Sequence, residues 1–179
     1  RATPSREVLE RAIGVLKEWD ARHFDRTDEA RAYHLAARLQ LETAARSISV
    51  TERANVASLR EGNRIALVGK GGKEQVFELS PNLHRTLRLW FSINPGSLAG
   101  QRAYQSAYAR AVLAVGGKVT GTHGVRRRAA RDQYGNLYRQ AVGSGVAPAG
   151  AAAKAEGDVI ETLGHSRDRR DHRAWYLGR

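Results

Sequence analysis

Two segments of the sequence carry side chains suited to proton transfer and anion binding. In THGVRRRAARDQY, His123 and Arg126 stand three residues apart, so on a helix they share a face. A guanidinium can clamp one phosphate with two hydrogen bonds, while an imidazole beside it accepts or donates a proton. The plainer interpretation is a basic helix face that touches phosphates, and this pair alone does not decide between the two.

The second segment is LGHSRDRRDHRAWYLGR, residues 163–179, in which His165 and Tyr176 stand on either side of an arginine-rich stretch. A solvated basic tail would explain the arginines, but it would not explain a histidine and a tyrosine placed around them. By residue type the segment also contains three metal ligands, His165, Asp168 and His172. The surrounding arginines would repel a divalent cation, so we expect no metal site here.

A third segment, GKGGKE, is rich in glycine and lysine. It is not a phosphate-binding loop of the Walker type, which needs a Lys followed by Ser or Thr at the start of a helix. Short apolar runs flank it at 65–68 and 75–79, and this predicts a β-hairpin. The tip then holds either two solvated lysines or a flexible Lys70 that reaches into a nucleic-acid groove.

The elements that would position these groups are mostly helical. Amphipathic spacing and start signals predict helices over 8–19, 33–44, 81–90, 101–115, 123–138 and 148–163, with Arg46 at the end of the second one. Only the hairpin has the pattern of strands, so the fold class is mostly α with a small β-hairpin or sheet (α+β). Three tyrosines are expected in the core: Tyr33, Tyr104 and Tyr108. Tyr134 and Tyr138 share a helix face and should pack together.

Composition limits the class of protein. At 179 residues, with 41% hydrophobic and 27% charged residues, the chain suits one globular domain. It has no apolar run long enough for a membrane helix and no signal-peptide pattern. The net charge of +12 favours a polyanionic partner, nucleic acid first and a membrane surface second. The absence of cysteine excludes disulfides and thiolate metal sites, and the absence of methionine indicates a fragment of a longer protein.

The order of these motifs resembles the catalytic domain of the tyrosine recombinases over nearly the whole chain, most of all the phage-type integrases of proteobacteria. The matching stretches are ETAARSIS, GKGGKEQVFEL, THGVRRRAARDQY, LGHSR and YLGR. The resemblance implies that 1–179 is a catalytic domain whose upstream core-binding domain is absent. It also implies six catalytic residues: Arg46, Lys70, His123, Arg126, His165 and Tyr176.

The resemblance implies a role for each of these residues in breaking and rejoining double-stranded DNA without a cofactor or metal. Tyr176 would attack the scissile phosphate and leave a 3′-phosphotyrosyl link and a free 5′-hydroxyl. Arg46 and Arg126 would stabilise the charge of the transition state, and His165 would add a hydrogen-bond donor. Lys70 would protonate the departing 5′-oxygen. His123 would assist proton transfer at the tyrosine.

Further expectations concern partners and alternatives. Other basic residues are candidates for contact with DNA: Lys73, Arg127, Arg128, Arg167, Arg169 and Arg170. The protein is expected to assemble as a tetramer on DNA at the nucleoid of the bacterial cytoplasm, with no membrane partner, and to integrate or excise a phage or mobile element. One alternative is a recombinase-derived DNA-binding protein that no longer cleaves. Another is a basic RNA-binding helical domain, although the aromatic stacking motif of common RNA modules is missing.

Three features of the sequence depart from the family pattern. Ser49 stands where the family usually has a Glu, and Arg127 stands where it often has a second His. His165 and Tyr176 are eleven positions apart, two more than the family commonly has, so a strict count would place the nucleophile at Ala174. The match to YLGR favours Tyr176, while the altered spacing is what makes the non-cleaving alternative worth testing.

Overall fold

The structure is a computed structural model that describes residues 3–24, 31–164 and 170–178. Its helices are α1 (Arg6–Phe24), α2 (Tyr33–Thr43), α3 (Ser47–Val50), α4 (Pro81–Ile93), α5 (Gln101–Ala114), α6 (Thr122–Gly143), α7 (Pro148–Thr162) and α8 (Arg170–Leu177). Two 3-10 turns lie at Val56–Ser58 (η1) and Lys70–Gly72 (η2). The strands are β1 (Leu59–Arg60), β2 (Arg64–Val68) and β3 (Glu74–Glu78). The prediction of a mostly helical chain with a small sheet is confirmed.

The sheet contains the predicted hairpin and one additional short strand. The strand order is β1-β2-β3, and both pairs are antiparallel. Ile65 lies opposite Phe77, and both side chains are buried on the face that packs against the helices. At the tip, Gly71 and Gly72 have φ angles of 75° and 76°, which residues with a Cβ rarely adopt. The glycines therefore fix the turn that carries Lys70.

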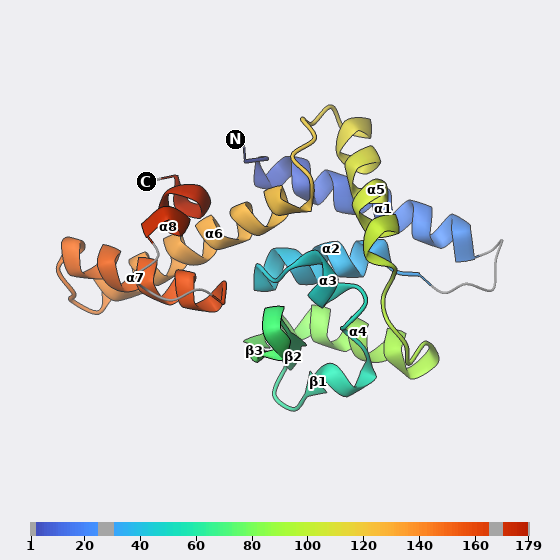
Figure 1. The fold of residues 1–179 in the computed structure, drawn as a ribbon, viewed down its shortest axis with the longest axis horizontal. Helices are drawn as coiled ribbons and strands as arrows, with labels where there is room; N and C mark the ends of the chain where they lie inside the picture. The colour runs from blue at the N-terminus through green and yellow to red at the C-terminus, as the bar shows by residue number, and fades with distance from the viewer. Residues whose placement is uncertain (1–2, 25–30, 165–169, 179) are drawn as a thin grey trace.

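The main core forms where α1, α2 and α5 meet, and Figure 1 shows α5 crossing α1 above α2. Both helical tyrosines of α5, Tyr104 and Tyr108, are fully buried there, as predicted. Tyr104 donates a hydrogen bond to Oε1 of Gln40 at 3.0 Å. Among the described residues, no helix is both long and apolar enough to cross a bilayer.

The long helix α6 runs away from this core, and α7 and α8 pack against its outer part (Figure 1). Small side chains lie between α6 and α7, among them Ala141 on α6 and Ala155 on α7, both of which are buried. Small residues let two helix backbones approach closely. This packing brings the end of α7 opposite the sheet. Tyr134 and Tyr138 on α6 stack with ring centroids 6.1 Å apart, as predicted.

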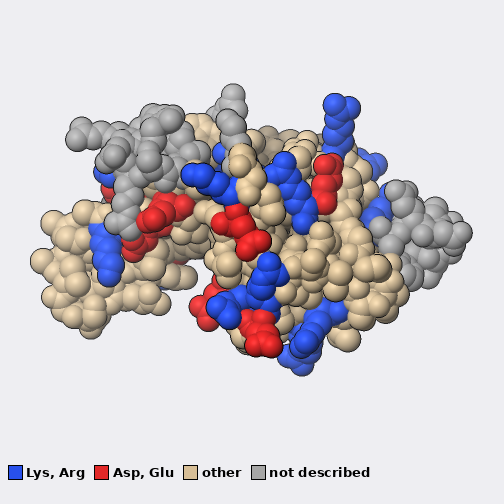
Figure 2. All heavy atoms as spheres, turned by 60° about the horizontal axis from the view of Figure 1, so that its bottom comes forward, with Lys and Arg blue, Asp and Glu red and all other residues tan. Residues whose placement is uncertain are grey.

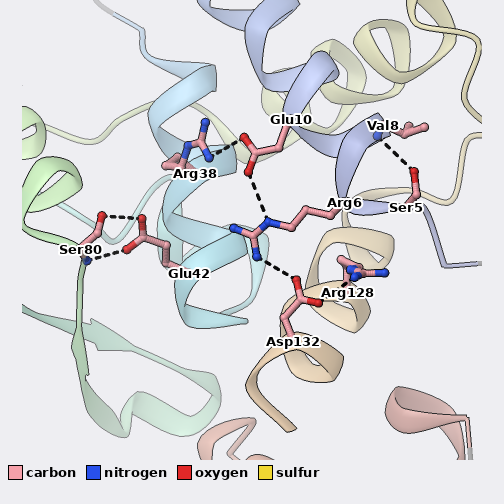
Figure 3. Close-up of polar contacts among 9 residues, drawn as sticks. All are labelled: Ser5, Arg6, Val8, Glu10, Arg38, Glu42, Ser80, Arg128 and Asp132. Atoms are coloured by element: carbon pink, nitrogen blue, oxygen red, sulfur yellow. Dashed lines mark hydrogen bonds and ion pairs between the residues drawn. The ribbon is translucent and has the colours of Figure 1, made fainter. Parts of the chain in front are cut away.

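A network of ion pairs holds α6 to the helices of the core (Figure 3). Asp132 on α6 pairs with Arg6 of α1 at 3.0 Å and with Arg128 of its own helix at 2.9 Å. Glu10 of α1 pairs with Arg38 of α2 at 2.6 Å. These contacts hold the middle of α6 to α1, and α1 to α2.

Glu42, near the end of α2, holds the start of α4 (Figure 3). Its two carboxylate oxygens accept hydrogen bonds from the backbone N and from Oγ of Ser80, each at 2.8 Å. The Ser80 Oγ in turn accepts from the backbone N of Leu83 at 3.3 Å, as expected of an N-cap serine before Pro81. The helix that supports the sheet is thereby tied to α2.

Candidate active site

A cavity of about 140 Å³ lies between the start of α3, the β2–β3 hairpin and the end of α7. Its charged lining residues are Arg46, Lys73, Glu74 and Arg126. Glu74 is engaged by Arg60, which lies 3.5 Å away. Three cations against one carboxylate make this a positive cavity, suited to an anion.

Arg46 is held at the turn between α2 and α3. We expected it at the end of the second helix, but α2 ends at Thr43 because Ala44 adopts a left-handed conformation, with φ of 54°. Arg46 instead is the N-cap residue of α3. The turn is fixed by the Nε2 of Gln40, which donates to the Ala45 carbonyl at 3.0 Å. Within the described chain, the Arg46 guanidinium makes no hydrogen bond or ion pair.

Arg126 reaches the same cavity from the first part of α6. It is 3% exposed, and its Nη2 donates to the Leu163 carbonyl at 2.6 Å. Its Nε is buried and has no hydrogen-bond partner among the described residues. Burial lowers the pKa of Arg126 from its ordinary value to about 10. Interaction with Tyr176 opposes this change, and the like charge of Arg46 adds to it. Arg126 is therefore a charged group at neutral pH in surroundings that do not neutralise it.

Tyr176 lies against Arg126. The Arg126 Cζ is 5.2 Å from the centroid of the Tyr176 ring, within the range of a cation–π contact. A solvated basic tail was one explanation of the arginine-rich stretch before Tyr176, but Arg170–Leu177 form helix α8, and Tyr176 is 5% exposed. The Tyr176 carbonyl accepts a hydrogen bond from Nε of Arg131 at 3.2 Å. The helix forms because its apolar side packs on α6, and the tyrosine is part of that packing.

His123 begins α6 on its exposed side and is not among the described residues that line the cavity. Its ring lies edge-on to Trp175, with centroids 5.7 Å apart and planes at 83°. Trp175 in turn lies edge-on to Tyr176, with centroids 4.7 Å apart. The structure thus places Arg126 in the cavity and His123 beside Trp175, rather than bringing both side chains to one point.

The hairpin is tied to both sides of the cavity. Ser49, at the position where the family usually has a Glu, is buried, and its Oγ donates to the Val68 carbonyl at 2.9 Å. On the other side, Gln75 Nε2 donates to the carbonyls of Glu161 and Thr162 at 3.4 and 3.3 Å. These bonds join the strands that flank Lys70 to the helix that carries Arg46 and to the end of α7.

The remaining predicted site residues are distributed differently. His165, Arg167 and Arg169 lie outside the described residues, as do the side chains of Lys70 and Arg170. Lys73 is exposed and lines the cavity. Arg128 is paired with Asp132. Arg127 is 3% exposed, and its Cζ lies 5.0 Å from the centroid of the Trp175 ring, so this placement leaves little of it for a DNA phosphate.

The sequence reasoning overlooked two residues at the site, Trp175 and Gln75. Trp175 directly precedes the proposed nucleophile, and an aromatic residue in an otherwise charged segment was a signal that could have pointed to it. Gln75 offered no signal, because a glutamine on a short strand has many common explanations.

On the face of the molecule shown in Figure 2, the basic residues do not form one continuous patch. Figure 2 shows Lys and Arg scattered over one side of the molecule with Asp and Glu between them, and a hollow between the part built on α7 and the rest. The excess charge of the whole chain therefore says less about the site than the local excess in the cavity does.

No protein-family model and no curated protein matches this sequence. Among solved structures, the chain is similar to the XerH site-specific recombinase bound to difH substrate in a pre-cleavage complex, with a TM-score of 0.62 at 18% identity. It is also similar to XerH bound to palindromic difH substrate in a post-cleavage complex, with a TM-score of 0.60 at 16% identity. These alignments cover 96% and 97% of this chain but 49% and 48% of the XerH chains, so this chain spans about half their length. The chain has a fold like that of the tyrosine-recombinase catalytic domain.

Proposed function

We propose that this chain is the catalytic part of a tyrosine site-specific recombinase that breaks and rejoins double-stranded DNA through a 3′-phosphotyrosyl intermediate. One observation carries the proposal: Arg126 lines a positive cavity together with Arg46 and also lies 5.2 Å over the ring of Tyr176. An anion-binding site and a hydroxyl nucleophile are thus held by one side chain. The fold supports the proposal, as does the similarity to XerH, whose solved complexes contain its difH substrate.

In the proposed reaction the scissile phosphate enters the cavity and its non-bridging oxygens bind Arg46 and Arg126. The Tyr176 Oη attacks phosphorus, its proton passes to a base for which His123 is the candidate, and the bond to the 5′-oxygen breaks. Lys70 supplies the proton that this 5′-oxygen takes up, and His165 donates a hydrogen bond to the phosphate. The phosphotyrosyl ester keeps the bond energy, so attack by a second 5′-hydroxyl rejoins the strands without a cofactor.

The proposed catalysis requires the scissile phosphate and the Tyr176 Oη to come together. Tyr176 is 5% exposed as a residue, with Arg126 on one side and Trp175 on another, and it is not among the described residues that line the cavity. Binding of DNA would have to favour a conformation in which the tyrosine, still oriented by its neighbours, reaches the cavity. If that conformation never forms, the chain binds DNA without cleaving it, which is the second function that the burial of Tyr176 favours.

The partners proposed for this chain are a DNA duplex and further copies of the protein, arranged as a tetramer on the recombination site at the bacterial nucleoid. The net charge of +12 suits a domain that contacts phosphates, and the affinity should then fall steeply as salt rises. The biological reaction we propose is integration or excision of a phage or mobile element, with the chain as part of a longer enzyme.

The test is to trap the covalent intermediate. Because the target sequence is unknown, the substrate is a pool of duplexes with a randomised centre, each nicked near that centre so that the cleaved short strand is lost and rejoining is prevented. We expect a protein–DNA adduct that survives denaturing electrophoresis and maps to Tyr176, and we expect Tyr176→Phe to abolish it. Tyr138→Phe, which alters an α6 tyrosine stacked on Tyr134, is the matched control and should keep the adduct.

Three results would contradict parts of this proposal. Binding of the duplex pool with no adduct would show a DNA-binding protein that does not cleave. An adduct that persists in Tyr176→Phe would assign the nucleophile to another residue. Tighter binding to duplex RNA than to duplex DNA in competition would indicate an RNA-binding domain instead.

A further inference from the structure

Two arginines of α6 lie against two aromatic rings of α8. Arg126 and Arg127 are consecutive, and so are Trp175 and Tyr176. Arg126 Cζ lies 5.2 Å from the Tyr176 centroid, and Arg127 Cζ lies 5.0 Å from the Trp175 centroid. Both arginine residues are 3% exposed. Two adjacent cation–π contacts, each made by a buried arginine, join α8 to the helix that carries the arginine proposed to bind phosphate.

Trp175 also makes two edge-on contacts that link the proposed nucleophile to the proposed base. Its ring meets Tyr176 at 4.7 Å and 81°, and it meets His123 at 5.7 Å and 83°. Edge-to-face pairs have a preferred geometry, so each contact restricts the orientation of the second ring. The tryptophan is 40% exposed, which means that it is far from fully buried in the core. Its ring contacts among the described residues are with His123, Tyr176 and the Arg127 guanidinium.

We infer that Trp175 is a positioning residue that orients the Tyr176 phenol and the His123 imidazole, while Arg127 holds Trp175 itself in place. This inference rests on the proposed function for its rate measurement, since it concerns how the nucleophile is presented. It also assigns Arg127 a role inside the protein in place of a contact with DNA.

The rate test compares two substitutions of Trp175 on the nicked duplex pool. Trp175→Ala should slow the single-turnover rate of adduct formation by about tenfold, the size expected when two edge-to-face contacts are lost. Trp175→Phe keeps an aromatic edge and should recover most of the rate. The affinity for DNA should stay within about twofold in both variants, because the ring touches no group that we assign to phosphate binding.

A second measurement reports on Tyr176 without any reaction. The chain has six tyrosines, so labelling with 3-fluorotyrosine gives a small set of fluorine resonances, and Tyr176→Phe identifies the one that belongs to Tyr176. In Trp175→Ala this resonance should shift while the other five stay in place, and in Trp175→Phe it should move back toward its original position. This result does not depend on whether the chain cleaves DNA.

The control separates positioning from simple attachment of α8. Arg173 on α8 lies 3.7 Å from Glu156 of α7, so Arg173→Gln weakens the attachment of the helix without altering the rings. If Arg173→Gln slows the reaction and shifts the Tyr176 resonance as much as Trp175→Ala does, the tryptophan only fastens the helix and the inference is wrong. It is also wrong if Trp175→Ala leaves both the resonance and the rate unchanged. Absence of an adduct in the wild type would overturn the proposed function, and the fluorine resonance would still test Trp175.

Discussion

The buried charge of Arg126 should make the protein less stable than it would be without it. Burial lowers its pKa from the ordinary value of an arginine to about 10. That change corresponds to a cost of about 3 kcal/mol for holding the charged form. Replacing Arg126 with Met removes the charge at similar length, but it also removes the donor to the Leu163 carbonyl, which contributes about 1–2 kcal/mol. We therefore expect Arg126→Met to raise the free energy of unfolding by about 1–2 kcal/mol.

A bound oxyanion should reverse this order and make the wild type more stable than Arg126→Met. Sulfate bound by Arg46 and Arg126 stabilises only the folded wild type, and a site with a Kd of about 1 mM adds about 3 kcal/mol at about 100 mM sulfate. The variant should gain only the general effect of sulfate on folded proteins. Urea unfolding with sulfate, and with sodium chloride at equal ionic strength, measures both effects. Arg128→Met, two residues along α6 and paired at the surface with Asp132, should keep the sulfate response of the wild type.

The difference in stability between the wild type and Arg126→Met should change with pH in one direction. The folded-state pKa of Arg126 is lower than the unfolded-state value, so the folded protein releases this proton first as pH rises. The destabilisation is therefore fully present below about pH 10 and shrinks between about pH 10 and 12.5. The advantage of Arg126→Met should accordingly be constant from about pH 6 to 9. A variant that is less stable than the wild type in chloride, or that responds to sulfate equally, would show that Arg126 is satisfied by the fold and does not await an anion.

Two further predictions concern the core and the hairpin. Burial raises the pKa of both Tyr104 and Tyr108, so the stability they contribute is complete below about pH 10 and is lost as pH rises above it. The Tyr108 hydroxyl has no hydrogen-bond partner among the described residues, so Tyr108→Phe should raise the free energy of unfolding by about 1 kcal/mol at neutral pH and reduce the loss of stability at alkaline pH. Tyr104→Phe should lower the free energy of unfolding by about 1–2 kcal/mol, because Gln40 loses the hydroxyl that donates to it. Equal effects of the two substitutions in urea unfolding would contradict this assignment. Gln75→Ala should lower the free energy of unfolding by about 0.5–1 kcal/mol and speed amide hydrogen exchange at 161–164. Unchanged exchange at these residues would show that the hydrogen bonds of Gln75 do not hold the end of α7.

The helices of this chain were predictable because their apolar residues recur with helical spacing and their ends carry clear signals. Ser80 followed by Pro81 predicted the start of α4, and the structure shows the serine capping that helix. The hairpin was predictable from the glycines at its tip. Strand β1 was missed because two residues, Leu59 and Arg60, carry no alternating pattern, and they form a strand only because β2 lies beside them.

Helix α8 was missed for a different reason. Its sequence, RDHRAWYL, is charged enough to be interpreted as a solvated segment. The helix depends on contacts that lie far away in the sequence: Arg131 of α6 donates to the Tyr176 carbonyl, and Arg126 and Arg127 lie against its rings. Local pattern contains no information about such contacts.

The candidate site shows the same division between local and distant information. Each arginine could be singled out by type, but nothing local in the sequence places Arg46 and Arg126, eighty positions apart, at one cavity. Their meeting depends on how α2 packs on α6, where Nε2 of Gln133 donates to the Glu42 carbonyl at 3.1 Å. Only the order of motifs shared with a known family suggested it, and that order gave no indication that Trp175 would lie between His123 and Tyr176.

The electrostatics of the cavity are the strongest physical argument that it serves a function. A folded chain gains nothing from holding two guanidiniums near each other when burial and mutual repulsion both oppose the charge of Arg126. Ordinary packing would place a carboxylate between them, as Asp132 of α6 is placed between Arg6 of α1 and Arg128 of α6. The only acidic side chain among the described lining residues, Glu74, is paired with Arg60. Local unfavourable energy of this kind concentrates at functional sites, and the group that would relieve it here is an anion with several oxygens, such as a phosphodiester.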